Sequence, residues 1–245
     1  MRRWYFRWLI PCALSGSIIA LSGCSGSDNA GARPISNTLR LLQAGDYYEY
    51  TIRGRASRPD VEPEDEPYVS GQVRVRISNA LVSGEPTLRI EYLTTLRLGD
   101  IPYESRYALH CVQERNPRDL RLVAYEDETG EITPISRFSL VPGLWSIGYS
   151  QSYDGDFVYS LTTIGQDVVR TPLGKFTAWR CIVRSELRPE DPFANAIRTI
   201  WYAPQVGVPV VEQFQTTFPT EEGVWNLSIT QQLTFTTVPI PDTNL

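Results

Sequence analysis

After Gly45, apolar and polar residues alternate along the chain with a period of two. Successive side chains of a β-strand point to opposite faces of a sheet, so this alternation is typical of antiparallel strands with one buried face. The clearest case is the segment 225–236. Its predicted inner face carries Trp225, Leu227, Ile229, Leu233 and Phe235, and its outer face carries Asn226, Ser228, Thr230, Gln232, Thr234 and Thr236. Similar runs cover 48–53, 72–78, 88–98, 103–113, 157–163, 179–187, 197–201 and 206–214.

Short turn signals separate these runs, among them Ser83-Gly84, Gly99-Asp100 and Asp154-Gly155. Two-residue turns of this kind join antiparallel neighbours as hairpins. No stretch after residue 45 has the pattern of an amphipathic helix of ten or more residues. The sequence therefore predicts an all-β fold with few helices, in which a strongly curved antiparallel meander sheet forms an open barrel or half-barrel. We expect a single domain over residues 35–245.

The first 24 residues follow a different pattern. A start rich in arginine precedes an apolar run at residues 8–21, which is too short to span a bilayer. This arrangement predicts a signal peptide at residues 1–23. Residues 24–34 are mostly small and polar, and we interpret them as a flexible tether.

Leu21-Ser22-Gly23-Cys24 resembles the lipobox of bacterial lipoproteins. The resemblance implies that the Cys24 sulfur is diacylated, that the chain is cut before it and that the freed amine is also acylated, typically with palmitate. At about 0.8 kcal/mol per buried methylene, three acyl chains anchor a protein stably in a membrane. Ser25 stands where aspartate retains such lipoproteins in the inner membrane, which favours the outer membrane facing the periplasm. An ordinary secretory peptide cleaved nearby is the alternative.

The charge of the chain limits the classes of partner it can bind, and its cysteine content predicts a disulfide. The formal net charge is -5, and loss of the three leader arginines lowers it to about -8, which argues against nucleic acid. The expected partners are the membrane through the Cys24 anchor, a lipid or amphipathic ligand, and an envelope protein. Cys111 and Cys181 remain after processing, and an even pair in an oxidising compartment predicts one disulfide.

Three segments together resemble a group of uncharacterised bacterial envelope lipoproteins. Residues 41–50 resemble their "PL-x-x-G-x-x-W-x-Y" opening, 171–176 their "TP-x-G-x-F" turn, and 201–207 their "WYAP-x-VG" segment. The chain departs from the pattern by having Tyr47 or Tyr48 where Trp is commoner, and by lacking Pro before Leu41. These proteins are similar in kind to lipoprotein-carrier half-barrels of the LolA/LolB type. The resemblance implies an apolar concave face and an envelope location, and it supplies no catalytic residues.

Catalytic patterns are sparse in the sequence. The single histidine, His110, lies on the predicted strand face opposite Leu109 and Cys111, where we expect it to be exposed. A His-dependent triad or a His-rich metal site is therefore hard to assemble. Phosphate-binding and calcium-binding loop patterns are also missing from the sequence. We predict no catalytic residue, no metal site and no cofactor.

Large aromatic residues are the candidates for ligand binding. They either fill the core or line a concave pocket for a lipid, glycan or peptide. The candidates are Trp145, Trp179, Trp201, Tyr202 and Trp225. The leading hypothesis is a non-enzymatic, lipid-anchored envelope protein that binds an apolar or amphipathic ligand, or a protein partner, on a curved sheet. The alternatives are a structural or assembly scaffold with a filled core and, as a third, a carboxylate-dependent envelope hydrolase.

Lipidation at Cys24 has a direct test. Because only a thiol can accept the diacylglyceryl group, Cys24→Ser is expected to leave an uncleaved or soluble precursor. Membrane fractionation of cells that express the variant measures this loss of anchoring. A variant that still pellets with membranes and resists carbonate extraction would show that the lipobox interpretation is wrong.

Overall fold

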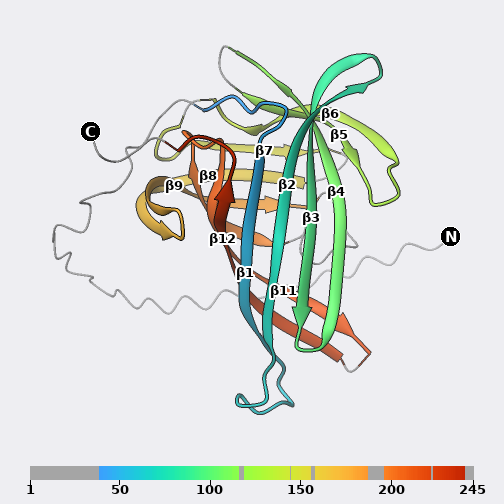
Figure 1. Ribbon diagram of the computed structural model, residues 1–245, viewed down its shortest axis with the longest axis vertical. Coiled ribbons are helices and arrows are strands. Elements are labelled where there is room, and N and C mark those ends of the chain that lie inside the picture. Colours follow the sequence, from blue (N-terminus) through green and yellow to red (C-terminus); the bar gives the residue numbers. More distant parts are fainter. Residues whose placement is uncertain are drawn as a thin grey trace. The chain divides into compact units, whose positions relative to one another are not determined.

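The alternating segments form strands throughout the described part of the chain. The computed structural model describes residues 39–115, 119–143, 145–155, 158–186, 196–221 and 223–240, so Cys24, the predicted signal peptide and the tether lie outside the described residues. Twelve strands and no helix occur in these ranges (Figure 1). The strands are β1 (Tyr47–Ser57), β2 (Tyr68–Val82), β3 (Glu85–Leu98), β4 (Ile101–Gln113), β5 (Leu120–Glu126), β6 (Ile132–Val141), β7 (Ser150–Asp154), β8 (Val158–Thr171), β9 (Gly174–Ser185), β10 (Ile197–Ala203), β11 (Val208–Thr220) and β12 (Gly223–Thr236).

All twelve strands belong to one antiparallel sheet, in the order β6-β5-β4-β3-β2-β1-β12-β11-β10-β9-β8-β7. The order follows the chain except at one place, where β1 pairs with β12, from Tyr48 opposite Thr236 to Ser57 opposite Asn226. In Figure 1 the first strand, in blue, lies beside the last, in red. The sheet curves into a nearly closed barrel with one seam, between β6 and β7. The predicted all-β curved meander is confirmed.

None of the described residues belongs to a helix with the length and apolarity to cross a membrane.

The predicted turns join neighbouring strands. Ser83 and Gly84 connect β2 to β3 in a two-residue turn, with φ of 51° and 83°. Two central residues with positive φ match the right-handed twist of the flanking strands. The 171–174 segment turns β8 into β9, with the Leu173 amide donating to Thr171 Oγ1 over 3.1 Å. Phe176, which ends this motif, is fully buried.

Register shifts bend several strands and correct one sequence prediction. Between β1 and β12, Tyr50 is opposite Leu233 while Glu49 is opposite Phe235, so β12 carries one extra residue there. Such a bulge changes the face on which the following side chains lie. Phe235 was expected on the inner face with Leu233, but it is 47 % exposed and packs against the Tyr47 ring, with centroids 6.1 Å apart.

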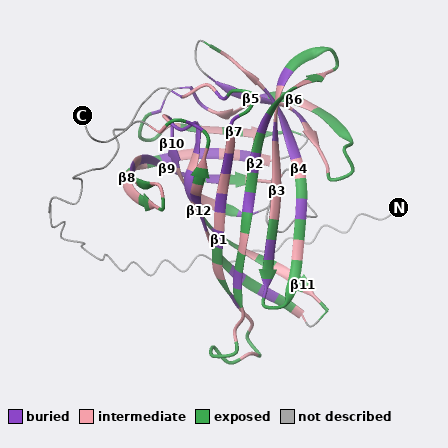
Figure 2. Cartoon of the chain, in the orientation of Figure 1, coloured by how far each residue is buried: buried purple, intermediate pink, exposed green. Residues whose placement is uncertain are grey.

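Burial otherwise alternates along the strands as expected. Figure 2 shows buried and exposed positions in turn along β2 and β12. The inner face packs into one core that includes Tyr48, Val69, Leu161 and Ile229. At about 25 cal/mol per Å² of apolar surface buried, this inner face supplies the main stabilisation of the barrel.

Two glycines permit the close approach of neighbouring strands in the curved part of the sheet. A Cβ added to Gly71 in β2 would lie 2.2 Å from the Thr95 carbonyl oxygen and 2.7 Å from Leu96 Cα. A Cβ on Gly54 in β1 would lie 2.4 Å from the Ser228 carbonyl oxygen. In both cases the obstacle is backbone, which cannot rotate away as a side chain would. These glycines let the sheet fold closely upon itself.

Gly71→Ala is therefore expected to destabilise the protein by about 1–3 kcal/mol, the usual cost of overpacking. Gly165→Ala is the matched control, because Gly165 also lies inside a strand and has no atom within 4 Å of an added Cβ. The control should match or slightly exceed wild-type stability. Urea unfolding measures both variants, and equal stability of the two would contradict the close-approach explanation.

Candidate functional site

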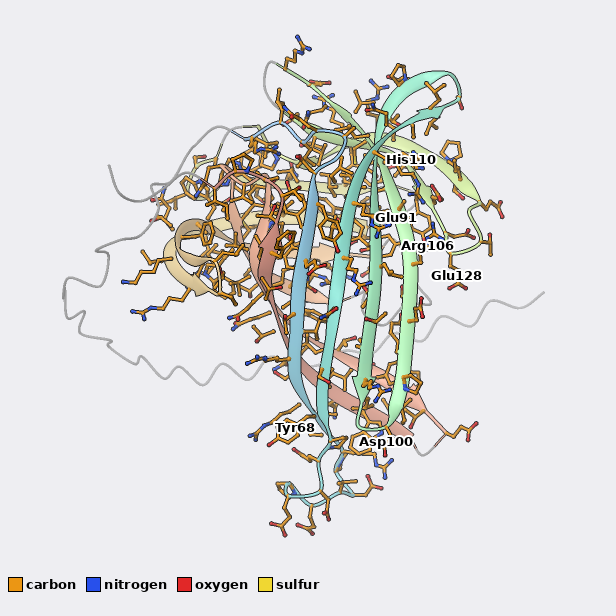
Figure 3. All side chains as sticks on the ribbon, in the orientation of Figure 1. Tyr68, Glu91, Asp100, Arg106, His110 and Glu128 are labelled. Atoms are coloured by element: carbon orange, nitrogen blue, oxygen red, sulfur yellow. The ribbon has the colours of Figure 1, made fainter. Side chains whose placement is uncertain are left out.

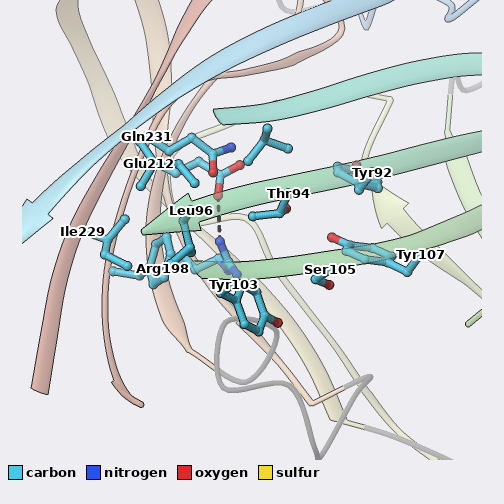
Figure 4. A pocket seen from close by; sticks show the side chains of 13 residues that line it. Tyr92, Thr94, Leu96, Tyr103, Ser105, Tyr107, Arg198, Glu212, Ile229 and Gln231 are labelled. Atoms are coloured by element: carbon cyan, nitrogen blue, oxygen red, sulfur yellow. Dashed lines mark hydrogen bonds and ion pairs between the residues drawn. The ribbon is translucent and has the colours of Figure 1, made fainter. Parts of the chain in front are cut away.

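Two adjoining cavities lie on the inner face of the sheet. The larger has a volume of about 200 Å³ and the smaller about 80 Å³. Tyr92, Tyr107, Arg198 and Glu212 line both cavities. Figure 4 shows the smaller cavity with these residues around it. The larger cavity is mainly apolar, and its aliphatic lining consists of Leu109, Leu140, Val141, Leu161, Val183, Ile200 and Pro209.

Tyrosines from three neighbouring strands form one wall. Tyr92 of β3 is in register with Tyr107 of β4, so their rings stack with centroids 4.8 Å apart and planes within 9° of parallel. Tyr125 of β5 follows at 6.3 Å from Tyr107. Register between strands thus converts inward tyrosines into a continuous aromatic surface. We call Tyr92, Tyr107 and Tyr125 the tyrosine wall.

An ion pair lies on the inner face of the strands β10 and β11. Arg198 Nη1 is 3.0 Å from Glu212 Oε2, and their side chains are only 20 % and 15 % exposed. The Arg198 guanidinium also lies 4.3 Å from the centroid of the Phe214 ring. Charges withdrawn from water are tolerated when paired in this way. The dashed line in Figure 4 marks the pair where it faces the cavity.

The larger cavity borders the seam of the barrel. Across the seam, Gln151 Nε2 donates to the Ser139 carbonyl oxygen at 3.0 Å, and the Tyr159 hydroxyl donates to the Leu140 carbonyl oxygen at 2.5 Å. Leu140, Val141 and Tyr159 also line the cavity. Side-chain contacts therefore close the wall of the cavity at the seam. They are fewer than the backbone hydrogen bonds between two paired strands.

Burial sets the chemistry of the tyrosines. It raises the pKa of Tyr92 well above its usual value, and the nearby Glu212 carboxylate raises it further. Burial likewise raises the pKa of Tyr202, which lines the larger cavity. Both phenols stay neutral at physiological pH and serve as hydrogen-bonding groups.

Of the five predicted aromatic residues, one lines a cavity. Tyr202 lies on the wall of the larger cavity, and its hydroxyl donates to the Gly207 carbonyl oxygen at 2.6 Å. Trp145 stacks behind it at 4.7 Å and lies 6.4 Å from Trp179. Trp225 is buried beside Arg58. These three tryptophans are buried and line neither cavity, in keeping with the core-filling alternative.

Trp201 lies on the opposite face from Tyr202. Its indole Nε1 donates to Asp167 Oδ2 at 3.0 Å, and it lines neither cavity. Arg198 and Glu212 were not among the site residues predicted from the sequence. The sequence does contain a signal for them. Both are charged residues on the inward face, two positions from Ile200 and Phe214, where an alternating strand normally carries an apolar residue.

The predicted disulfide is not formed. Cys111 and Cys181 are free, buried thiols, on β4 and β9. Seven pairings along the sheet order separate these strands, and neither is a neighbour of the other. Burial raises the pKa of both thiols above the usual value, which keeps them protonated. They behave as small core residues.

His110 is buried, against expectation. It does lie on the face opposite Leu109 and Cys111, but residues 108–111 are buried on both faces of β4, and His110 is only 1 % exposed. Its Nε2 is 3.0 Å from Glu126 Oε2, and its Nδ1 is 3.5 Å from Thr87 Oγ1. The alternation of side chains along the strand therefore predicted the correct face for His110, but the expected exposure was wrong.

His110 ends a chain of charged groups across β3, β4 and β5. Arg89 holds both oxygens of Glu126 at 2.7 Å, and it contacts Glu91 Oε1 at 3.3 Å. Arg106 contacts the same Glu91 oxygen at 2.6 Å. Figure 3 labels His110, Glu91 and Arg106 along these strands. None of these residues lines either cavity, so we assign the network to stability.

In the described ranges, no three His, Cys, Asp or Glu side chains are grouped so that they could hold a metal ion.

Comparison with known proteins gives little beyond this geometry. No protein-family model matches the chain, and the curated proteins contain no significant match. The chain is similar to the crystal structure of a presumed exported protein with a YmcC-like fold from Bacteroides fragilis. The two are 11 % identical with a TM-score of 0.38, over 83 % of this chain and 100 % of the other. The resemblance to envelope lipoproteins stays a prediction.

Glu126 should make stability depend on pH. Its hydrogen bonds with Arg89 lower the pKa of its carboxyl from 4.5 to about 2, and the bond with His110 adds to this effect. A carboxyl with a lowered folded-state pKa stabilises the fold above its unfolded pKa, and this stability is lost as pH falls toward 2. Glu126→Gln should therefore lose less stability than wild type between pH 5 and pH 2.5 in urea unfolding.

Glu128→Gln, at the exposed turn between β5 and β6, is the control and should keep the wild-type pH profile. Identical profiles for wild type and Glu126→Gln would contradict the role of this carboxyl.

Proposed function

We propose that this protein is a non-enzymatic, lipid-anchored protein of the bacterial cell envelope that binds a small apolar or amphipathic ligand inside its barrel. The anchor is Cys24, and the surface that carries it is the outer membrane facing the periplasm. The ligand occupies the larger cavity, between the tyrosine wall and the Arg198–Glu212 pair. The observation that carries the proposal is this cavity of about 200 Å³.

The size and lining of the cavity support ligand binding over a filled scaffold. Well-packed cores contain few voids larger than a water molecule. An engineered apolar cavity of about 150 Å³ stays dry and binds benzene. The larger cavity exceeds that size, and it combines aliphatic and aromatic walls with a few polar groups, which is the usual composition of a small-molecule site. It has room for one ring or a short alkyl segment.

The residues with catalytic potential support a non-enzymatic role. His110, Cys111 and Cys181 line neither cavity. Among the described residues that line the cavities, Glu212 is the one carboxylate, and its partner is Arg198. A glycosidase would need two carboxyl groups that face one another across a substrate. The envelope location rests on the leader and lipobox pattern in residues 1–24.

A protein partner is the second candidate. The strands β6 and β7 end the sheet order, so within the described part of the chain each has one backbone edge without a paired strand. An edge of this kind can accept an added strand from another chain. The side-chain contacts of Gln151 and Tyr159 across the seam would then be replaced by main-chain hydrogen bonds.

Filling the cavity tests the proposal. Val183 in β9 points into the larger cavity and is 8 % exposed, so Val183→Phe should occupy much of its volume. Benzene is a suitable probe because it carries no charge and matches one ring. We expect wild type to bind benzene and Val183→Phe to bind it at least about tenfold more weakly, as measured by ligand-observed NMR.

The adjacent Ile182 provides the control. Its side chain lies on the outer face and is 43 % exposed, so Ile182→Phe should bind benzene as wild type does. Equal binding by wild type and Val183→Phe, with both folded, would contradict the assignment of the ligand to this cavity. No binding by wild type would favour the scaffold.

A further inference from the structure

We infer that the ligand of the interior site is an electrically neutral molecule with one flat ring or a short apolar body and a hydroxyl or carbonyl group, and that the Arg198–Glu212 pair excludes its charged analogues. This inference rests on the proposed ligand-binding function and names the class of ligand. It follows from the charge balance of the lining, its hydrogen-bonding groups and its shape.

The charged groups that line the site balance one another. Among the described residues that line the two cavities, Arg198 and Glu212 are the only ones with a formal charge at neutral pH, and they lie 3.0 Å apart. The site therefore has no net charge. An anionic ligand would have to take Arg198 from Glu212 and leave that carboxylate unpaired in a largely buried place. A cationic ligand would have to draw Glu212 away from Arg198. Separating a largely buried ion pair is costly, so both kinds of ion are disfavoured.

The hydrogen-bonding groups suit a neutral ligand. Tyr92 carries a phenol hydroxyl and lines both cavities. Burial and the Glu212 charge keep this phenol neutral, so it can donate to a carbonyl or accept from a hydroxyl. Thr94 and Gln231 add neutral polar groups to the smaller cavity. Figure 4 shows Thr94, Gln231 and Tyr92 around the ion pair.

The shape of the site favours a flat or short apolar body. The stacked pair Tyr92 and Tyr107 presents an aromatic wall, and another ring can lie against it in an offset or edge-on geometry. The aliphatic residues around it, such as Leu161 and Ile200, accept the rest of the apolar surface. The cavity of about 200 Å³ matches one ring or a short alkyl segment.

Three one-ring probes of nearly equal shape test the inference: benzyl alcohol, benzoate and benzylammonium. With the purified full-length protein at pH 7, ligand-observed NMR should show benzyl alcohol binding at least about tenfold more tightly than either ion. Tighter binding of benzoate or benzylammonium than of benzyl alcohol would overturn the inference and leave the proposed function intact. Failure of benzyl alcohol and of benzene alike to bind would overturn both.

Variants of the ion pair sharpen the test. Glu212→Gln removes the one negative charge of the lining and leaves the positive charge of Arg198, so benzoate should gain at least about tenfold in affinity over wild type. Arg198→Gln should produce the same gain for benzylammonium. The double variant with Arg198→Gln and Glu212→Gln has a neutral lining again, so it should prefer benzyl alcohol. It keeps the test decisive if a single variant does not fold. Glu85→Gln, in the exposed pair with Arg137, is the control and should bind all three probes as wild type does.

If folded Glu212→Gln or Arg198→Gln ranks the three probes by affinity as wild type does, the ion pair does not exclude charged ligands and this role is overturned.

Discussion

The pairing of β1 with β12 is the contact on which the rest of the structure depends. It joins strands from the two ends of the described chain, and without it β1–β6 and β7–β12 would be two separate meanders. Each meander would expose one apolar face. Their union at this ladder lets the sheet curve until the tyrosine wall of β3–β5 and the charged pair of β10–β11 line the same cavities. Because this contact is so distant in sequence, its loop-closure cost is high and slow folding is expected.

The same constraint explains the position of the seam. A meander closed by its first and last strands must leave its opening between two strands in the middle of the chain, and here these are β6 and β7. Side chains such as Gln151 and Tyr159 hold that opening. The larger cavity lies beside it, so the least firmly bonded part of the wall is also part of the candidate site.

Local patterns predicted most of the strands, and long-range register determined the rest. Period-two alternation identified the strands other than β5, β6 and β7, and the turn signal at Ser83-Gly84 was correct, because both depend on neighbouring residues. The disulfide between Cys111 and Cys181 was predicted from the cysteine count and the compartment, and it is absent because the meander order keeps β4 and β9 apart. His110 was placed on the correct face, yet packing on both sides of β4 buries it. Arg198 and Glu212 could have been found as charges at inward positions, whereas their convergence with the tyrosine wall required the closed sheet.

The central claim is that the interior of the barrel holds a small neutral molecule. Native mass spectrometry of the protein isolated from its own membranes, without a denaturing step, tests this most directly. The predicted spectrum contains the acylated chain together with a second species, heavier by one small molecule that leaves as a neutral loss on collisional activation. Two results together would contradict the claim and indicate a scaffold: a spectrum that contains the acylated chain alone, and weak binding of benzene by the same preparation.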